Sequence, residues 1–328
     1  MNVTVLGGGS WGTALATHLV RAGHAVRLWV REAALARAIG ERHENARYLP
    51  GVALPDGITV STDLAASLEG AAFVLVVIPS EFCRGLYHRL APLLPPKVEV
   101  VSATKGLEVD TLLRMSEVAA EEIPDHPVSV LCGPSFALEV AQGQPTAVVV
   151  ASREVERAEA VQRMLSTQTL RAYSSDDVVG AELAAALKNV IAIAAGIVDG
   201  LGHGRNTQAA LITRGLAEMT RLAVALGGSP ETLSGLAGLG DLVLTCTGEL
   251  SRNRRLGQAL GAGKTLEEAR AMTPMVAEGV RTTLAACALA ERTSTDMPIA
   301  REMREVLHRG KAPRAAALDL MMRSLKRE

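Results

Sequence analysis

Two lysines stand in surroundings where a lysine is expected to do chemistry. Lys188 lies within the apolar segment Leu183–Ala192, where burial would disfavour the charged ammonium and favour proton transfer near neutral pH. It could instead pack its stem on a helix and hold its ammonium in solvent. Lys105 follows the expected strand Val98–Ala103, and ligands of open α/β sheets bind beyond the carboxyl ends of such strands. Lys105 could also be an ordinary turn residue beside Gly106.

Three further segments carry polar groups that could face a ligand. Gly133–Ala137 follows the expected strand Val128–Leu131, where its N–H groups and the Ser135 hydroxyl could contact a ligand or merely end the strand. Ser251–Arg254 combines guanidinium forks with neutral hydrogen-bonding groups, which suits a phosphate clamp, although the same run could form a solvated basic turn. Asp241 could pair with a lysine and orient it, or cap the helix that follows.

The glycine-rich segment Gly7–Gly12 fits the pattern GxGxxG between an expected strand and an expected helix, Ser10–Ala22. Gly7 would allow a tight turn, Gly9 would let the backbone approach a pyrophosphate, and Gly12 would let helix and strand pack closely. The helix N-terminus then faces the phosphates. A glycine turn can be purely structural, but the strand–turn–helix context favours a dinucleotide site.

The end of the second expected strand bears on the choice of dinucleotide. The strand Ala25–Val30 ends at Arg31, which is followed by Glu32. An arginine at this point accommodates a 2′-phosphate, whereas an acidic residue holds a ribose 2′-hydroxyl. The pair therefore indicates tolerance of NADPH and leaves NADH open, unless both residues are merely solvated at the start of the next helix.

The elements that must position these residues change character midway along the chain. Short β-branched runs alternate with helices in the first half, which is typical of a doubly wound α/β domain with a largely parallel sheet. The expected strands are Asn2–Leu6, Ala25–Val30, Ile58–Val60, Ala72–Ile78, Val98–Ala103, Val128–Leu131, Thr146–Ala151 and Leu170–Tyr173. Helical spacing then predicts Glu182–Asp199, Gln208–Leu226, Leu266–Met272, Val280–Ala290 and Pro298–Leu307. We expect a dinucleotide-binding domain over residues 1–175 and an all-helical substrate domain over residues 176–328, with Ser174–Asp177 starting a helix.

Composition excludes several classes of function. The 328 residues carry 34 Lys+Arg against 35 Asp+Glu and few aromatic side chains, which offers no basic or stacking surface for nucleic acid. The four cysteines are widely spaced and have no histidines at metal-ligand spacing, so we expect no metal site. Apolar runs such as Val190–Val198 are too short for a membrane span, and the start resembles no secretory signal. These features predict a cytoplasmic protein.

The order of these motifs resembles that of the bacterial-type NAD(P)-dependent glycerol-3-phosphate dehydrogenases. The resemblance covers essentially the whole chain, and it is most specific at Leu187–Asn189 and at Thr245–Gly248 with Ser251–Asn253. Ala185 departs from the family, which commonly has glycine there, and we expect the added methyl to shift packing rather than chemistry. Glu81 is also unusual for its region.

The resemblance implies a Rossmann domain joined to a helical domain like that of 6-phosphogluconate dehydrogenase. It implies cofactor contacts, to NADP(H) or NAD(H), from Ser10, Trp11, Arg31, Lys105, Ala137, Val276 and Glu278. It implies a substrate site of Lys105, Gly133, Ser135, Lys188, Asp241, Ser251, Arg252 and Asn253, with Arg252 also reaching the cofactor. The activity it implies is reversible hydride transfer between NAD(P)H and C2 of dihydroxyacetone phosphate, which supplies sn-glycerol 3-phosphate for phospholipids. Lys188 would then be the proton donor.

Two alternatives follow from the same features. A β-hydroxyacid or 6-phosphogluconate dehydrogenase shares the two-domain plan but is expected to have Asn four residues after its lysine, where this chain has Ala192; Asn189 follows Lys188 directly. A non-catalytic NADPH-sensing protein would leave the lysines and the phosphate clamp without a use. The Ala- and Leu-rich helical half could also offer a face for a homodimer.

Overall fold

The computed structural model describes residues 1–272 and 276–325. The chain divides into two compact units. The first comprises Met1–Lys105 with Leu113–Val178, and the second comprises Gly106–Leu112 with Val179–Glu328. The short segment Gly106–Leu112 therefore packs with residues that come much later in the chain, which local sequence patterns did not indicate.

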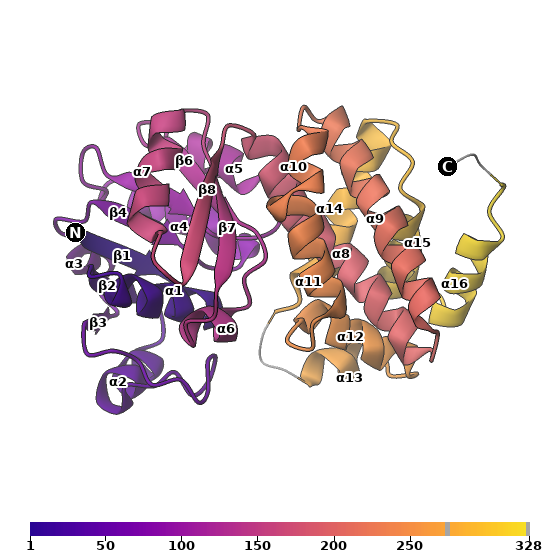
Figure 1. Cartoon of the computed structure of the whole chain (residues 1–328), viewed down its shortest axis with the longest axis horizontal. Helices are drawn as coiled ribbons and strands as arrows, with labels where there is room; N and C mark the ends of the chain where they lie inside the picture. Colours follow the sequence, from indigo (N-terminus) through magenta and orange to yellow (C-terminus); the bar gives the residue numbers. More distant parts are fainter. Residues whose placement is uncertain (273–275, 326–328) are drawn as a thin grey trace. The chain divides into compact units, whose positions relative to one another are not determined.

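The first unit contains one eight-stranded sheet with the order β3-β2-β1-β4-β5-β6-β7-β8 (Figure 1). Neighbouring strands are parallel except for β6 and β7, which are antiparallel. The register places Val5 of β1 between Leu28 of β2 and Leu75 of β4. The strands are β1 Asn2–Leu6, β2 Ala25–Trp29, β3 Ile58–Ser61, β4 Phe73–Val76, β5 Glu99–Ser102, β6 Val128–Cys132, β7 Thr146–Ala151 and β8 Leu170–Ser175. The predicted doubly wound, largely parallel sheet is confirmed.

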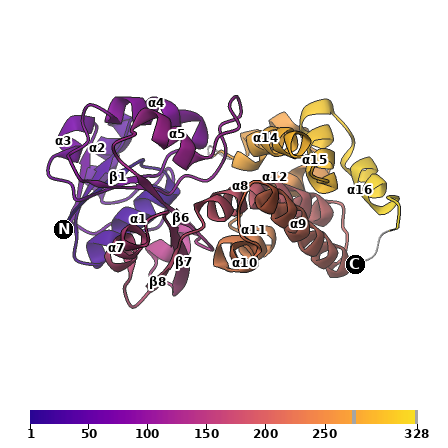
Figure 2. The ribbon, with the colours of Figure 1, turned by 90° about the horizontal axis from the view of Figure 1, so that it is seen from above.

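Helices cover both faces of this sheet and bury its apolar side chains. Leu15 and Leu19 of α1 belong to one core cluster, whereas Tyr87 and Leu90 of α4 belong to another. Figure 2 shows α4 and α5 on one side of β1 and α1 and α7 on the other. The elements are α1 Ser10–Arg21, α2 Ala33–Arg42, α3 Leu64–Leu68, a 3₁₀ turn Ser80–Phe82, α4 Cys83–Leu90, α5 Met115–Glu122, α6 Ala137–Ala141 and α7 Val155–Leu165.

The passage from the sheet into the helical unit differs from the prediction. Ser174 and Ser175 were expected to start a helix, but they extend β8, because β8 pairs with β7 as far as Ala151 and Ser175. The Ser175 hydroxyl accepts a hydrogen bond from the Asp177 N–H at 3.2 Å. The long helix that follows begins at Val178.

From Val178 onward, the regular elements of the described residues are all helices, as predicted. The elements of the second unit are α8 Val178–Gly200, α9 Arg205–Ala225, α10 Pro230–Ser234, a π-helical turn Leu236–Gly240, α11 Asp241–Thr247, α12 Arg252–Gly261, α13 Leu266–Ala271, α14 Glu278–Arg292, α15 Pro298–Arg309 and α16 Pro313–Met321. The sequence analysis did not predict α10, α11, α12 or α16. These helices are short, so each contains too few apolar residues to show a helical spacing.

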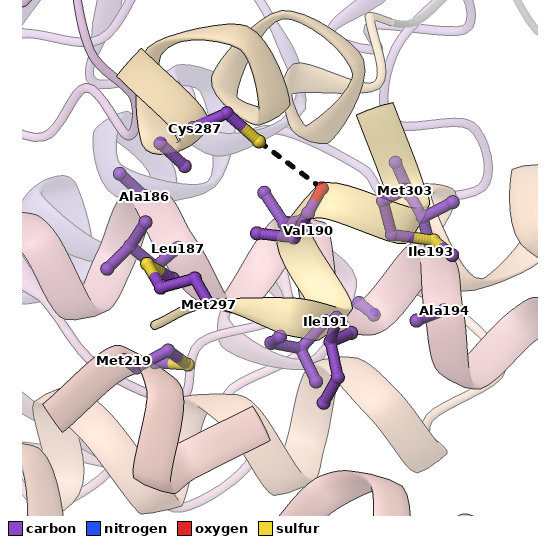
Figure 3. Packing of buried hydrophobic residues seen from close by; sticks show 14 of the residues in the cluster. Ala186, Leu187, Val190, Ile191, Ile193, Ala194, Met219, Cys287, Met297 and Met303 are labelled. Atoms are coloured by element: carbon purple, nitrogen blue, oxygen red, sulfur yellow. Dashed lines mark hydrogen bonds between the residues drawn. The ribbon is translucent and has the colours of Figure 1, made fainter. Parts of the chain in front are cut away.

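Helix α8 is the centre of the second unit. By length and composition it could cross a membrane, and among the described residues it is the one helix that could, but its apolar window is wholly buried inside the protein. Figure 3 shows its side chains packed with Met219 of α9, Met303 of α15 and Cys287 of α14. The Cys287 thiol donates to the Ala300 carbonyl at 3.4 Å. Helix α8 is therefore a core helix, and it carries Lys188 in its interior.

Candidate functional site

Lys188 and Asp241 form a buried ion pair in the helical unit. The Lys188 Nζ contacts Asp241 Oδ1 and lies 3.0 Å from Thr245 Oγ1. The Thr245 hydroxyl donates to the Asp241 main-chain carbonyl at 2.6 Å. The Lys188 and Asp241 side chains keep only 5% and 2% of their surface exposed. The ammonium is therefore held at one place, away from bulk water, beside a carboxylate and a hydroxyl.

This geometry decides between roles that the sequence left open. Lys188 does not extend to solvent, since the whole residue is 4% exposed. Asp241 is the first residue of α11, where its negative charge also suits the positive end of the helix. Its side chain contacts the lysine, so the pairing role that the sequence left open is present in the structure.

Thr245 was missed as an individual residue of the cluster. It lies one helical turn after Asp241, and that i, i+4 spacing on α11 was the available signal. The next residue, Cys246, is an unsuitable proton acceptor or nucleophile, because burial raises the pKa of its thiol to about 12. Lys188 and Asp241 are the other ionisable side chains of this cluster.

Helix α8, which carries Lys188, packs closely against helix α12, which carries Arg252. A Cβ atom on Gly196 of α8 would lie 2.0 Å from the Arg254 carbonyl oxygen, and one on Gly257 of α12 would lie 2.0 Å from the Ile193 carbonyl oxygen. The two backbones therefore touch, which only glycine allows. Arg254 also donates to Asp199 of α8 at 2.8 Å.

The Ser251–Arg254 run starts α12 and does not form a solvated turn. The Ser251 hydroxyl accepts from the Arg254 N–H at 3.2 Å as a helix cap. The Asn253 amide bonds to Asn189 of α8 and to the Gly279 N–H. Burial lowers the pKa of the Arg252 guanidinium, and the negative charge of Glu278 opposes that effect. A partly buried arginine at a helix N-terminus is well suited to bind a phosphate.

Residues at the start of α14 lie beside this run. Glu278 is the first residue of α14 and is half-buried, while Val276 precedes the helix and is 39% exposed. The hydrogen bond from Gly279 to Asn253 fixes this segment to α12 at 3.1 Å. The sequence-predicted residue Glu278 is therefore held close to Arg252, and Val276 lies two residues before it in the chain.

In the sheet unit, the glycine turn has the shape that a pyrophosphate requires. Gly7 has φ +128°, and a Cβ atom there would lie 2.3 Å from the Val77 carbonyl oxygen. A Cβ atom on Gly12 would lie 1.9 Å from the Gly7 carbonyl oxygen, whereas one on Gly9 would meet nothing within 4 Å. The first and third glycines are thus required by packing, and the second borders open space at the N-terminus of α1. These residues fit a dinucleotide phosphate.

The residues after the glycines are also ordered at this turn. Ser10 begins α1, and its hydroxyl donates to the Tyr48 carbonyl at 2.6 Å. Trp11 is partly buried, and its side chain packs against the core under α1. Both residues therefore stand in the first turn of α1, directly after Gly9.

Arg31 lies at the carboxyl end of β2 with two partners. Its Nη2 is 3.0 Å from Glu32 Oε1, and its guanidinium carbon is 5.6 Å from the centre of the Phe82 ring. The Phe82 ring, 46% exposed, was not predicted, although its place shortly after β4 was a signal. Glu81 is exposed in the same 3₁₀ turn.

Lys105 and Ser135 converge at the carboxyl ends of β5 and β6. The Lys105 Nζ lies 3.5 Å from the Gly133 carbonyl oxygen, and the Ser135 hydroxyl donates to the same oxygen at 3.0 Å. Gly133 has φ +113°, and Ala137 begins the short helix α6. These contacts bring together three of the predicted substrate residues, Lys105, Gly133 and Ser135. Among the described residues, no cluster of three or more histidine, cysteine or acidic side chains could hold a metal ion.

Comparisons with known proteins agree along the whole chain. Residues 2–158 match the family model "NAD-dependent glycerol-3-phosphate dehydrogenase N-terminus", and residues 177–318 match the model for the C-terminus of the same family. A relative from Oleidesulfovibrio alaskensis, named glycerol-3-phosphate dehydrogenase [NAD(P)+], is 51% identical over 100% of both chains. One of the same name from Geobacter sulfurreducens is 50% identical over 99% of this chain and 98% of its own.

A solved structure gives the same result in three dimensions. The crystal structure of glycerol-3-phosphate dehydrogenase from Coxiella burnetii superposes with a TM-score of 0.95 at 43% identity. The match covers 98% of this chain and 99% of that chain. Sequence and fold therefore lead to one family across both units.

Proposed function

The chain belongs to the NAD-dependent glycerol-3-phosphate dehydrogenase family, and from that premise we propose that it interconverts dihydroxyacetone phosphate and sn-glycerol 3-phosphate with NAD(P)H or NAD(P)+. The buried contact of Lys188 with Asp241 is the observation that best supports this proposal. When bound, the nicotinamide supplies or accepts the hydride at C2 of the substrate. The chain must then manage the charge that appears on the C2 oxygen.

In this proposal Lys188 donates a proton to the C2 oxygen during reduction and takes it back during oxidation. Asp241 holds the ammonium in place, and the Thr245 hydroxyl restricts it to one direction. Lys105 adds positive charge to the substrate site, and the neutral residues Gly133 and Ser135 lie beside it. Preorganised charges of this kind stabilise a developing oxyanion without waiting for solvent to reorient.

We assign the substrate phosphate to Arg252 at the N-terminus of α12, with Ser251 and Asn253 beside it. The guanidinium offers a planar fork and the helix adds the positive end of its dipole. Holding the phosphate fixes C2 relative to the reacting groups, which lowers the entropic cost of the reaction. Arg252 would also reach the cofactor.

For the cofactor we propose that the turn Gly7–Gly12 holds the pyrophosphate, with Ser10 and Trp11 beside it. The cofactor is also contacted by Ala137, Val276 and Glu278. Arg31 binds the 2′-phosphate of NADPH. The exposed ring of Phe82, over which Arg31 lies, offers a flat apolar surface for the adenine. Residues 1–175 would thus serve the dinucleotide and residues 176–328 the substrate.

We further propose a cytoplasmic enzyme that supplies glycerol 3-phosphate to phospholipid synthesis and works as a homodimer. The exposed apolar side chains of Leu318, Met321 and Met322 on and just after α16 give the helical unit a surface for a second copy. Light scattering on purified protein would distinguish a dimer from a monomer.

The decisive assay follows the loss of reduced-nicotinamide absorbance with dihydroxyacetone phosphate, using NADPH and NADH separately. 6-Phosphogluconate with oxidised cofactor serves as the control substrate. Turnover of the triose phosphate alone is expected. Binding of NADPH without turnover of either substrate would support a sensing protein and would remove the roles given to Lys188 and Arg252.

A further inference from the structure

Asn253 takes part in a chain of buried amides that joins three helices of the second unit. The Gly279 N–H of α14 donates to Asn253 Oδ1 at 3.1 Å. Asn253 Nδ2 of α12 donates to Asn189 Oδ1 at 3.0 Å. Asn189 Nδ2 of α8 then donates to the Ala185 carbonyl at 3.3 Å. Asn189 and Asn253 are 5% and 8% exposed, so these bonds form away from bulk water.

Backbone packing reinforces this chain at Gly279. A Cβ atom on Gly279 would lie 2.5 Å from the Asn189 carbonyl oxygen. The start of α14 thus rests directly against the backbone of α8, one residue after Lys188. A shift of α14 would therefore displace the backbone of α8 next to Lys188.

A second contact runs parallel to the amide chain. Arg252 and Glu278 immediately precede Asn253 and Gly279, and the negative charge of Glu278 favours the charged form of Arg252. Arg252 and Glu278 thus interact through charge, and Asn253 and Gly279 interact through a hydrogen bond. The N-termini of α12 and α14 are held in register by both.

We propose that Asn253 is a positioning residue that couples the cofactor segment Val276–Glu278 to the helix carrying Lys188. It acts through Asn189 and Gly279, because its carbonyl oxygen and one of its amide N–H groups are already bonded to them. The inference rests on the proposed function only for the roles of Glu278 and Lys188. Removing the amide leaves buried donors and acceptors without partners, which costs more than an average hydrogen bond.

The test compares Asn189→Ala, Asn253→Ala and the double variant. NADPH affinity is measured by fluorescence titration. The kcat and the KM values for dihydroxyacetone phosphate and NADPH are measured by steady-state kinetics. We expect the NADPH dissociation constant to rise about fivefold in Asn189→Ala and about tenfold in Asn253→Ala. The double variant should lose no more affinity than Asn253→Ala, because both substitutions break the same chain.

Asn206→Ala, at an exposed position of α9, is the matched control and should leave NADPH affinity unchanged. A rise confined to the KM for dihydroxyacetone phosphate, with NADPH affinity intact in all variants, would make Asn253 only a phosphate ligand and overturn the proposal. So would lowered thermal stability with unchanged NADPH affinity. If Asn253→Ala fails to fold, Asn189→Ala tests the same chain from its other end.

Failure of the proposed function would be seen separately. Wild-type protein that binds NADPH but does not reduce the triose phosphate refutes the proposed reaction, while the titrations still test the coupling. Wild-type protein that binds neither NADPH nor NADH refutes the coupling as well.

Discussion

Two ion pairs in this molecule show how burial changes what opposite charges can do. Lys188 and Asp241 keep 5% and 2% of their side-chain surface exposed, whereas Arg31 and Glu32 keep 66% and 38%. Water screens the exposed pair, so another anion can replace Glu32 at little cost. The buried charges depend on each other, because neither can return to water. The first pair suits proton transfer at a fixed atom, and the second suits exchange between a carboxylate and a phosphate.

Replacing Lys188 by Met should have the largest effect. Loss of the proposed proton donor is expected to lower kcat about a thousandfold, which is within the usual range for general acid catalysis. The measurement is steady-state turnover of dihydroxyacetone phosphate, with NADPH affinity and the circular dichroism spectrum checked beside it. Lys264→Met, at an exposed position, is the matched control. Near-normal turnover by folded Lys188→Met protein would remove Lys188 from the chemistry.

Asp241→Asn keeps the shape of the side chain and removes its charge. We expect kcat to fall about a hundredfold because the ammonium loses its orienting partner. The free energy of unfolding should fall by about 3 kcal/mol, since a buried charge is left unpaired. Asp125→Asn on the exposed surface of the sheet unit should change neither quantity. If denaturant titration finds Asp241→Asn as stable as the wild type, the buried pair does not behave as described.

Arg252→Ala tests a cation that lies between the two extremes of burial. Loss of a charged hydrogen-bond donor to phosphate should raise the KM for dihydroxyacetone phosphate about thirtyfold and leave kcat less affected. Arg255→Ala, on the same helix but exposed, provides the comparison. An unchanged KM would contradict the phosphate assignment.

Glu218 is a buried carboxylate paired with main-chain N–H groups and not with a lysine. It accepts from the Ile299 and Ala300 N–H groups at 2.8 and 3.3 Å, and burial raises its pKa from 4.5 to about 7. The folded state therefore holds this proton more tightly than the unfolded state. The resulting stabilisation is complete below pH 4.5 and is lost as pH rises towards 7.

Glu218→Gln should abolish this pH dependence. Relative to the variant, the wild type is expected to lose roughly 2–3 kcal/mol of unfolding free energy between about pH 5 and pH 8. Urea denaturation across that range measures the difference, and the exposed Glu267→Gln should follow the wild type. Parallel curves for wild type and Glu218→Gln would show that this carboxyl does not titrate in the range.

The separation of contacting residues along the chain explains what the sequence could predict. Neighbours within a few residues determine the glycine turn, the alternation of strands and helices, and the position of Arg31. Local patterns therefore indicate them. The contact of Lys188 with Asp241 joins residues 53 positions apart, and no spacing rule relates them. Asn189 and Asn253 meet only because Gly196 and Gly257 let α8 and α12 touch. The apolar surroundings of Lys188 left a buried and a solvent-exposed ammonium equally open, and its partner required the fold or a family resemblance.

Substitutions in the exposed pair should have the smallest effects and change selectivity more than rate. Arg31→Ala is expected to lower the ratio of kcat/KM for NADPH over NADH up to about tenfold, because a solvated guanidinium and phosphate interact weakly. Glu32→Gln should raise the same ratio two- to threefold, at roughly the strength of an exposed ion pair, by removing the carboxylate that competes for Arg31.

Salt separates this exposed pair from the buried one. Raising ionic strength should reduce the effects of Arg31→Ala and Glu32→Gln on the ratio, because water and ions reach the Arg31 guanidinium. The loss of kcat in Lys188→Met should not change with salt, since its surroundings exclude both. The exposed Arg37→Ala on α2 controls for a general loss of positive charge. If Arg31→Ala leaves the ratio unchanged at low salt, Arg31 does not bind the 2′-phosphate, and selectivity must come from another residue near the end of β2.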